Sequence, residues 1–312
     1  MSVKEAGTYH VPVLLKESID ALEVFPGGTY VDVTFGGGGH SKEILSRLKG
    51  KGHLYSFDQD ADAESNIGLG TLDKECFTFV RSNFRYLKNW MRYYGVEKID
   101  GILADLGVSS HHFDDEERGF SFRFDAPLDM RMNQAQKFSA ADVINNFDES
   151  RLIKIFSEYG EERFSKRIAA AICKARKISP LETTGELVKL IEQTVPRTKN
   201  GGHPAKRIFQ AVRIEVNNEL EILSGAITAA VKRLKIGGRI AVITFHSLED
   251  RIVKQTFKTL AQDCICPKNF PVCTCGHKAE IKILGKAKTA TADELNQNSR
   301  AKSAKLRIAE KI

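Results

Sequence analysis

The fold is set by the stretch Val31-Asp32-Val33-Thr34-Phe35-Gly36-Gly37-Gly38-Gly39-His40, in which four consecutive glycines separate an apolar, β-branched segment from a helical one. Thr29 to Phe35 has the character of a short buried strand, and Ser41 to Leu48 carries apolar residues at helical spacing. Glycine accepts positive φ and lets a ligand approach the backbone, while a helix start offers unpaired N–H groups. The stretch predicts a strand, a tight turn and a helix that bind a nucleotide-like cofactor. A flexible glycine linker is the alternative, and the flanking elements argue against it.

The residues around the glycines distinguish between cofactors. A dinucleotide-binding loop requires Gly-x-Gly-x-x-Gly, but the third glycine position falls on Ser41 or Lys42 in the two natural registers. The next predicted strand, His53 to Asp58, ends in a carboxylate where the ribose diol of an adenosine would lie. An acid-x-Thr-x-Gly-x-Gly loop followed by such an acid is the pattern of class I S-adenosylmethionine methyltransferases. Asp58 can instead be a turn residue, because further polar residues follow it.

The composition is that of a globular protein. A chain of 312 residues with 42% hydrophobic residues can bury a full core and has room for two domains. Met1 to Pro12 has no basic-then-apolar signal segment, and no apolar run approaches the roughly 18 residues that span a bilayer. We therefore expect a cytoplasmic protein with no membrane partner. The net charge of +7 favours an anionic partner such as nucleic acid, although surface lysines on an ordinary enzyme give the same sum.

Four of the six cysteines form a cluster: Cys264, Cys266, Cys273 and Cys275. Two Cys-x-Cys pairs can supply four thiolates to one tetrahedral zinc, whereas the more usual spacing in structural zinc sites is Cys-x-x-Cys. Reduced, unligated thiols on a loop are the alternative, and a reducing cytosol disfavours a disulfide. From the sequence alone we assign no metal ligand.

Strand and helix patterns alternate along the first third of the chain. The predicted strands are Thr29 to Phe35, His53 to Asp58, Phe77 to Arg81 and Ile99 to Asp105, and the helices between them are Ser41 to Leu48, Ala61 to Leu69 and Tyr86 to Tyr94. This βαβα order predicts a parallel sheet flanked by helices. The next convincing strand, Arg239 to Phe245, begins more than 130 residues downstream, whereas a βαβ unit needs on the order of 30. An insertion must fill that gap.

The insertion has a mostly helical pattern. Its predicted helices are Ala140 to Asn146, Glu149 to Tyr159, Glu162 to Ala175, Thr184 to Thr194 and Ala205 to Leu234. In the third of these, apolar residues mark one face, and the basic side chains of Arg163, Lys166, Arg167 and Lys174 lie elsewhere. The pattern predicts a small helical domain with a basic surface. Pro196 to Pro204 is the clearest internal loop, so we divide the chain into a core over 1–112, an inserted domain over 113–204 and a second core part over 205–312.

The last part of the chain completes the predicted sheet. A helix from Ser247 to Leu260 is followed by strand candidates at Glu280 to Leu284 and Lys305 to Ala309. Lys286 to Lys302 is polar, contains several lysines and lacks a packing period. We expect this segment to be an exposed, mobile loop.

A second informative stretch begins at Asp105, where the fourth predicted strand ends. Ligands of open parallel sheets bind outside the carboxyl ends of the strands, so Asp105 faces the same edge as the glycine loop. The stretch continues through Ser109, Ser110, His111 and His112. Alternatively, Asp105 is a loop-capping acid and the two histidines are solvated.

Two further stretches carry charged or titratable side chains. His203 to Asn217 is an amphipathic helix that leaves Lys206, Arg207 and Arg213 to pair with phosphate, or simply to form a solvated face: these two interpretations stay open. In Phe245 to Arg251, Ser247 with Asp250 resembles a capping box: that would explain both residues without catalysis. His246, at the end of the fifth predicted strand, is the better functional candidate.

Together these stretches closely resemble the bacterial RsmH (MraW) family, which methylates the N4 amino group of a cytidine in 16S ribosomal RNA. The resemblance runs nearly end to end, and the motifs that carry it are the glycine loop, His10 to Leu15, Asp105 to Ser110 with Arg118 and Leu128-Asp129-Met130-Arg131-Met132, Glu161 to Phe164, Arg167 to Ala169, the His203 helix, Phe245 to Arg251, and Ser299 to Arg307. The resemblance implies a class I Rossmann-like methyltransferase fold, a mostly parallel sheet with an inserted helical domain.

The resemblance also implies a set of S-adenosylmethionine contacts, which are Gly38, Gly39, His40, Asp58, Phe84 beside the adenine, Asp105 and His112. The position of His112 is usually glutamine in the family, and Lys206 stands where the family usually has threonine. Lys206 can add a phosphate contact. The implied partner is 16S rRNA in the small ribosomal subunit, and the oligomeric state is open, with a homodimer as one possibility.

The chemistry asks the protein mainly to position the acceptor, because S-adenosylmethionine carries its own leaving group. Cytosine N4 is a poor nucleophile, so acceptors that hydrogen-bond the amine should help. The Asn/Asp-Pro-Pro-aromatic motif of many amino methyltransferases is absent. We hypothesise that Asp105, Ser109 or His246 holds the amino group of a base unstacked from single-stranded rRNA. A methyltransferase for small molecules or proteins, and a non-enzymatic RNA-binding factor, are the competing interpretations.

Overall fold

A mostly parallel β-sheet forms the centre of one of the two compact units into which the chain divides. This sheet unit comprises Met1–Gly107 and Leu220–Ile312, and the helical unit comprises Val108–Glu219. The computed structural model describes residues 12–68, 75–196, 202–267, 270 and 272–312. Each unit has a hydrophobic core of its own.

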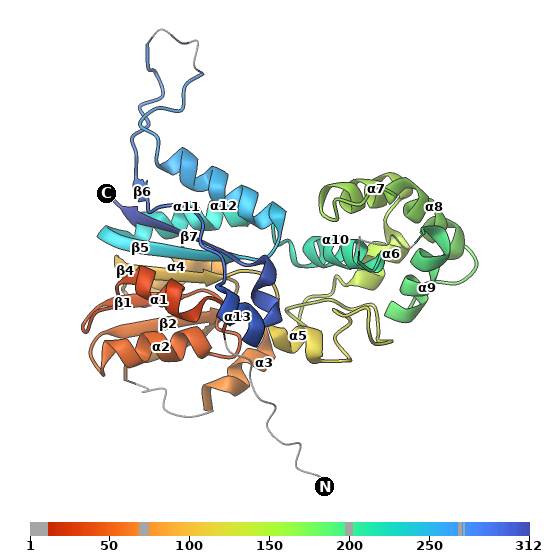
Figure 1. The fold of residues 1–312 in the computed structure, drawn as a ribbon, viewed down its shortest axis with the longest axis horizontal. Helices are drawn as coiled ribbons and strands as arrows, with labels where there is room; N and C mark the ends of the chain where they lie inside the picture. The colour runs from red at the N-terminus through yellow and green to blue at the C-terminus, as the bar shows by residue number, and fades with distance from the viewer. Residues whose placement is uncertain (1–11, 69–74, 197–201, 268–269, 271) are drawn as a thin grey trace. The chain divides into compact units, whose positions relative to one another are not determined.

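The sheet has the strand order β3-β2-β1-β4-β5-β7-β6 over the residues that the structure describes. Its strands are β1 (Thr29–Asp32), β2 (His53–Asp58), β3 (Phe77–Arg81), β4 (Ile99–Asp105), β5 (Leu234–Thr244), β6 (Ile281–Ile283) and β7 (Lys305–Lys311). β1 to β5 pair in parallel, whereas β7 runs antiparallel to both β5 and β6 (Figure 1). The strand order changes direction at β1, which lies between β2 and β4, and this is the position where open α/β sheets bind ligands.

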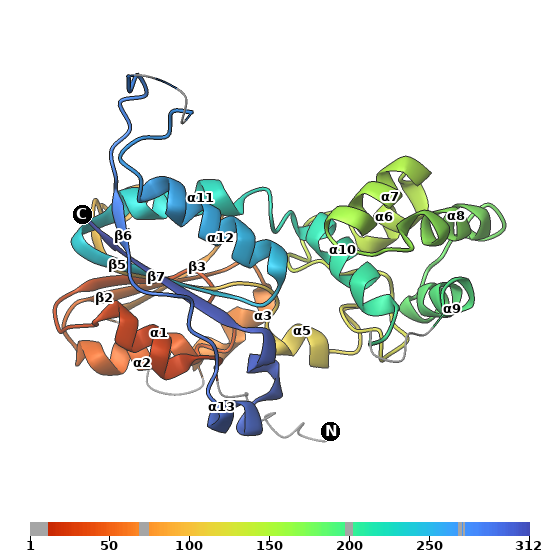
Figure 2. The ribbon, with the colours of Figure 1, turned by 45° about the horizontal axis from the view of Figure 1, so that its top comes forward.

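Helices cover both faces of the sheet, as the predicted βαβα order requires (Figure 2). They are α1 (Leu15–Leu22), α2 (Gly39–Leu48), α3 (Ala61–Glu64), α4 (Leu87–Tyr93), α11 (Leu223–Arg233), α12 (Ser247–Leu260) and α13 (Ala292–Gln297). Successive strand residues point to opposite faces. Ile243 of β5 therefore joins the core of α1 and α2, and its neighbour Val242 joins the core of α4, α11 and α12.

The helical unit is built around a separate apolar core. Its helices are α5 (Ser110–Asp114), α6 (Ala140–Asn146), α7 (Glu149–Glu158), α8 (Ser165–Ala175), α9 (Thr184–Thr194) and α10 (Ala205–Asn217). In α8, Ile168 and Ile172 are buried, while Lys166, Arg167 and Lys174 are exposed. The expected basic surface of this helix is therefore present.

The segment from Ala205 to Leu234 forms two helices and not the single helix that its periodicity suggests. α10 ends where Asn218 adopts a left-handed conformation with φ 51°, and α11 begins at Leu223. The apolar side of α10 packs into the core of the helical unit, so the boundaries lie after Gly107 and Glu219 and not after residues 112 and 204. Periodicity missed the break because apolar residues continue at helical spacing on both sides of it.

Most of Lys286 to Lys302 is exposed, as expected, but the expectation of a loop throughout is wrong. The segment contains α13 and a 3₁₀ turn over Ser299–Ser303, and Ala301 is buried. Glu294 Oε1 accepts a hydrogen bond of 2.6 Å from the backbone N–H of Leu14, 280 residues away. A polar helix held by such a long-range contact has no apolar period that the sequence could reveal.

Some sequence expectations fall on residues outside the described ranges. These are the start of the chain through Val11, the end of the helix predicted from Ala61 to Leu69, and most of the loop from Pro196 to Pro204. In the described part of that helix, α3 continues as a 3₁₀ turn over Ser65–Gly68. No helix among the described residues is long and apolar enough to cross a membrane.

Candidate cofactor and active site

The glycine loop joins β1 to α2 and is fixed by contacts from the neighbouring strand. The Phe35 N–H donates to the Phe57 carbonyl at 2.8 Å. The Gly36 N–H donates to Asp58 Oδ2 at 2.8 Å, and the Gly36 carbonyl accepts from Asn66 Nδ2 at 3.0 Å. Both backbone groups of the first glycine are therefore held, and the loop has a defined path along the carboxyl edge of the sheet.

The later glycines have no room for a side chain. Gly38 is the N-cap of α2 with φ 75°, and a Cβ there would lie 2.8 Å from the ring of the buried Phe35. A Cβ on Gly39 would collide with the side chain of Pro12. Because the N-cap is a glycine, no side chain caps the first turn. The N–H groups at this helix start can bind an anionic or polar ligand group.

Asp58 braces the loop and forms a turn at the end of β2. Its Oδ1 accepts from the Asp60 N–H at 2.9 Å, so the turn interpretation of Asp58 describes part of its role. A carboxylate at the end of this strand is the group that pairs with a ribose diol in open α/β sheets. The adjacent Gln59 accepts at 2.8 Å from Asn83 Nδ2, and Asn83 caps the 3₁₀ turn that begins with Phe84. This contact ties the Phe84 segment to the end of β2.

His40 is buried and neutral at pH 7. Its Nε2 lies 3.2 Å from the carbonyl oxygen of Val13, and burial lowers the pKa of His40 to about 4. Because only an N–H can pair with a carbonyl, the proton is on Nε2 and Nδ1 is an acceptor. Nδ1 faces Asp105, at 3.8 Å from Oδ2.

Asp105 ends β4 and stands among other acceptors. Its backbone N–H donates to Thr34 Oγ1 at 2.7 Å, while its buried Oδ1 has no hydrogen-bond partner among the described residues. Burial raises the pKa of Asp105 well above its usual value, and the nearby carboxyls of Asp32 and Glu249 raise it further. A cationic ligand at this edge would stabilise the Asp105 carboxylate.

His246 is the N-cap of α12 and forms a capping box with Glu249. The N–H of Glu249 points to His246 Nδ1 at 3.5 Å, and Glu249 Oε2 accepts from the N–H groups of Phe245 and His246 at 2.9 and 3.3 Å. His246 Nε2 also lies 3.1 Å from Glu249 Oε1. The imidazole therefore lies at the carboxyl end of β5, where it is oriented by a buried acid.

The capping box predicted for Ser247 and Asp250 is wrong by one residue, because Ser247 is already helical. Asp250 instead binds β7. Its carboxylate accepts from Arg307 at 2.7 and 3.1 Å and pairs with Lys305 at 3.2 Å. Burial alone would raise the pKa of Asp250, but these two cations hold it below its usual value. This residue fastens the antiparallel strand to α12.

Ser109 and His112 belong to the helical unit and pair with each other. Ser109 Oγ lies 2.8 Å from His112 Nδ1, and the buried imidazole packs against the Phe120 ring at a centroid distance of 4.7 Å. The interpretation of His112 as a solvated loop histidine is therefore wrong. The hydroxyl and the imidazole form one hydrogen-bonded unit, four and seven residues beyond Asp105 in the chain.

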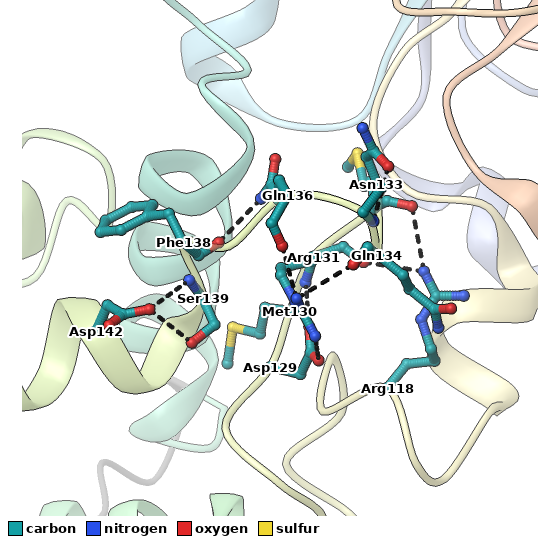
Figure 3. Close-up of polar contacts among 12 residues, drawn as sticks. Arg118, Asp129, Met130, Arg131, Asn133, Gln134, Gln136, Phe138, Ser139 and Asp142 are labelled. Carbon is teal, nitrogen blue, oxygen red and sulfur yellow. Dashed lines mark hydrogen bonds and ion pairs between the residues drawn. The ribbon is translucent and has the colours of Figure 1, made fainter.

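The stretch from Asp129 to Met132 is a framework loop of the helical unit. Figure 3 shows the two-pronged pair in which Arg131 donates to both oxygens of Asp129 at 2.8 and 2.6 Å. The buried guanidinium of Arg118 donates to the carbonyls of Arg131 and Met132 at 2.9 and 3.3 Å. Burial works to raise the pKa of Asp129, but the hydrogen bonds from Arg131 hold it lower than usual. These residues shape the unit and are committed to structural contacts.

The charged side of α10 is less available to phosphate than the sequence suggests. Lys206 and Arg207 are exposed. Arg213 is mostly buried and forms a two-pronged ion pair with Glu219, with both N···O distances at 2.9 Å. Of the three predicted phosphate ligands, the tertiary structure thus leaves two on the surface.

In the sheet unit, the structure places Gly38, Gly39, His40, Asp58 and Asp105 at one edge, linked by the contacts described above. Sequence analysis missed three residues that organise this edge: Thr34, Asn66 and Glu249. Thr34 is part of the acid-x-Thr pattern, and Glu249 follows His246 at capping-box spacing. Asn66 had no local signal, because its partner lies 30 residues away.

The fold and this edge define a class I S-adenosylmethionine-dependent methyltransferase. The strand order, the antiparallel β7 between β5 and β6, and the glycine loop after β1 followed by an acid at the end of β2 are its defining features. A profile of the MraW methylase family matches residues 7–312.

Curated relatives agree over nearly the whole length of the chain. Ribosomal RNA small subunit methyltransferase H of Phocaeicola vulgatus is 55% identical over 305 residues, which cover 97% of each chain. The protein of the same name from Clostridioides difficile is 51% identical over 308 residues, covering 97% of this chain and 99% of that one. The chain belongs to the MraW methylase family.

Proposed function

We propose that this methyltransferase transfers the methyl group of S-adenosylmethionine to the N4 amino group of a cytidine in the 16S rRNA of the small ribosomal subunit. Membership of the MraW methylase family supports the reaction, and the names of the curated relatives support the RNA substrate. The observation that carries the cofactor assignment is the group of acidic side chains around Asp105, beside a glycine loop in which Gly38 and Gly39 have no room for side chains.

The residues at this edge fit S-adenosylmethionine. The cofactor supplies a methyl group on a positively charged sulfonium, an already activated leaving group. The unpartnered Oδ1 of Asp105 and its raised pKa favour such a cation over a neutral or anionic ligand. The start of α2 at Gly39 presents backbone N–H groups, Asp58 places a carboxylate at the end of β2 where a ribose would lie, and Phe84 offers an apolar face for adenine.

The acceptor chemistry falls to side chains that can hold an amino group. As N4 forms its bond to the methyl carbon, the nitrogen becomes tetrahedral and cationic and then loses a proton. Asp105 has the raised pKa that suits a proton acceptor, and His246 and Ser109 are further acceptors. In this proposal Asp105, Ser109 or His246 orients the amine. His112, which is hydrogen-bonded to Ser109, replaces the family's usual glutamine and positions that hydroxyl.

RNA binding is assigned to the helical unit. Lys166, Arg167 and Lys174 on α8 and Lys206 and Arg207 on α10 are exposed cations that can pair with phosphates. A small metabolite would need no such surface. The target base must leave its stack to reach a protein side chain, so the substrate is a single-stranded or distorted region.

A radiolabelled methyl-transfer assay tests the proposal with small ribosomal subunits, naked rRNA and free cytidine as acceptors. We expect label in RNA and its recovery as N4-methylcytidine after nuclease digestion. Absence of label from every RNA would refute the function. If Asp105→Asn and Ser109→Ala both kept full methyl transfer and normal cofactor affinity, the proposed acceptor residues would be dropped while the function stood.

A further inference from the structure

Four cysteines come together in the segment between α12 and β6, far from the residues assigned to methyl transfer. α12 starts at the carboxyl end of β5, and its 14 residues span about 21 Å. The segment after it leaves the sheet unit at the edge opposite to the glycine loop (Figure 1). The four sulfur atoms of Cys264, Cys266, Cys273 and Cys275 all lie within 4.8 Å of one another.

The sulfur positions match a tetrahedral metal site. With a Zn–S bond of about 2.3 Å, the S···S edge of a regular ZnS₄ tetrahedron is about 3.8 Å. Cys275 Sγ lies 3.8 Å from Cys264 Sγ and 3.6 Å from Cys273 Sγ. A disulfide would require about 2.05 Å, so the spacing fits a shared ligand and not a bond between the sulfurs.

The surroundings of the sulfurs are also those of metal thiolates. The backbone N–H of Cys266 points to Cys264 Sγ at 3.4 Å, a contact that orients and stabilises a coordinating thiolate. No basic side chain is needed for this role, because the amide dipole supplies the positive end.

Among its described residues, the cysteine segment has large apolar side chains that are exposed and not packed in a core. Ile265, Phe270 and Val272 have 50%, 51% and 70% of their surfaces exposed. Its base is fixed to α12, where the Glu280 N–H donates to the Leu260 carbonyl at 2.7 Å and His277 Nε2 lies 3.0 Å from the Thr259 carbonyl oxygen. Beyond this base, a chain segment without a core needs a cross-link to keep one conformation, and a bound metal provides one.

We propose that Cys264, Cys266, Cys273 and Cys275 bind one structural Zn²⁺ ion. Four thiolates complete a tetrahedral shell and leave no open position, so the site holds the fold of the segment and takes no part in methyl transfer. The Cys-x-Cys spacing is less usual for structural zinc, but it still brings all four sulfurs within 4.8 Å of one another.

Zinc content of the purified full-length protein tests the proposal directly. Protein produced with zinc and dialysed without a chelator should contain about one zinc per chain by elemental analysis. Replacement by cobalt should give the intense visible bands and thiolate charge-transfer bands of a tetrahedral Co–S₄ centre. In the double variant Cys264→Ser with Cys275→Ser, the zinc retained after dialysis should fall at least about tenfold, since two of four ligands are lost.

Two controls separate metal loss from misfolding. Cys173→Ser, which changes a thiol in α8 of the helical unit, should keep the zinc content of the wild type. The double variant should still bind S-adenosylmethionine, because the cofactor residues lie at the opposite edge of the sheet. Zinc well below one per chain in the wild type, iron in its place, an intact mass reduced by the hydrogens lost in disulfide formation, or equal zinc in the double variant would each overturn the proposal.

Discussion

Replacement of Gly38 by alanine tests the role of the glycine loop. The residue has φ 75°, where an L side chain costs about 1–2 kcal/mol, and the new Cβ would lie 2.8 Å from the Phe35 ring. That ring cannot easily yield, because it packs against Phe77 and Phe79 with centroid distances of 5.9 and 5.3 Å. Overpacking of this kind adds about 1–3 kcal/mol, so we expect Gly38→Ala to lower the free energy of unfolding by about 2–5 kcal/mol.

The substitution should also weaken cofactor binding. Because the new Cβ meets the buried Phe35 ring, the loop must shift at the start of α2. The affinity for S-adenosylmethionine, measured by calorimetry where the variant is fully folded, should therefore fall at least about tenfold, or about 1.4 kcal/mol.

Gly50→Ala is the matched control at the other end of α2. Gly50 has φ 68° but nothing within 4 Å of its added Cβ. This variant should lose only about 1 kcal/mol of stability and keep its cofactor affinity. If Gly38→Ala bound S-adenosylmethionine as tightly as the wild type, the assignment of this loop to the cofactor would be refuted.

Three further predictions concern pH, packing and RNA. Burial lowers the pKa of His40 from 6.5 to about 4, so the stability that the neutral imidazole contributes is complete above pH 6.5 and should fall by roughly 3 kcal/mol as the pH drops toward 4. In His40→Gln, the free energy of unfolding measured in urea should depend less on pH over this window. An unchanged slope of unfolding free energy against pH would contradict the burial argument. Asp129→Ala removes the carboxylate of the two-pronged ion pair and leaves Arg131 with only backbone carbonyl acceptors, so it should cost about 2–4 kcal/mol, against less than about 1 kcal/mol for the exposed Arg81→Ala. Equal losses in urea unfolding would refute a framework role. Arg167→Ala and Lys174→Ala should each weaken RNA binding and reduce the slope of log K against log salt by about 1, whereas Arg81→Ala should leave both unchanged.

The local elements of the sheet unit could be predicted because each has its own signal. β2, β3 and β4 have the predicted bounds, and the glycine loop joins a strand to a helix as its composition indicates. Apolar periodicity does not reveal a mostly polar helix, nor a break that has helical spacing of apolar residues on both sides. It missed the polar helix α13 and the break at Asn218.

The candidate site was only partly predictable for the same reason. Asp58 and Asp105 lie at strand ends, which the rule for open sheets places at one edge. The neighbours that set the chemistry of Asp105, namely Asp32 and Glu249, come from elsewhere in the chain. Their effect on the pKa of Asp105 depends on distances in space, and these cannot be read from the spacing of residues in the sequence.

The sequence by itself determined the strand, turn and helix around the four glycines, because backbone φ and side-chain volume are local requirements. It also determined the family, through long motifs in a fixed order. Only the tertiary structure decided which acids share the edge with Asp105, that Arg213 is paired with Glu219 and not free for phosphate, and that four cysteine sulfurs converge on one point. Each of these depends on contacts between residues that packing brings together. Burial, charge and coordination act only over the short distances that such packing creates.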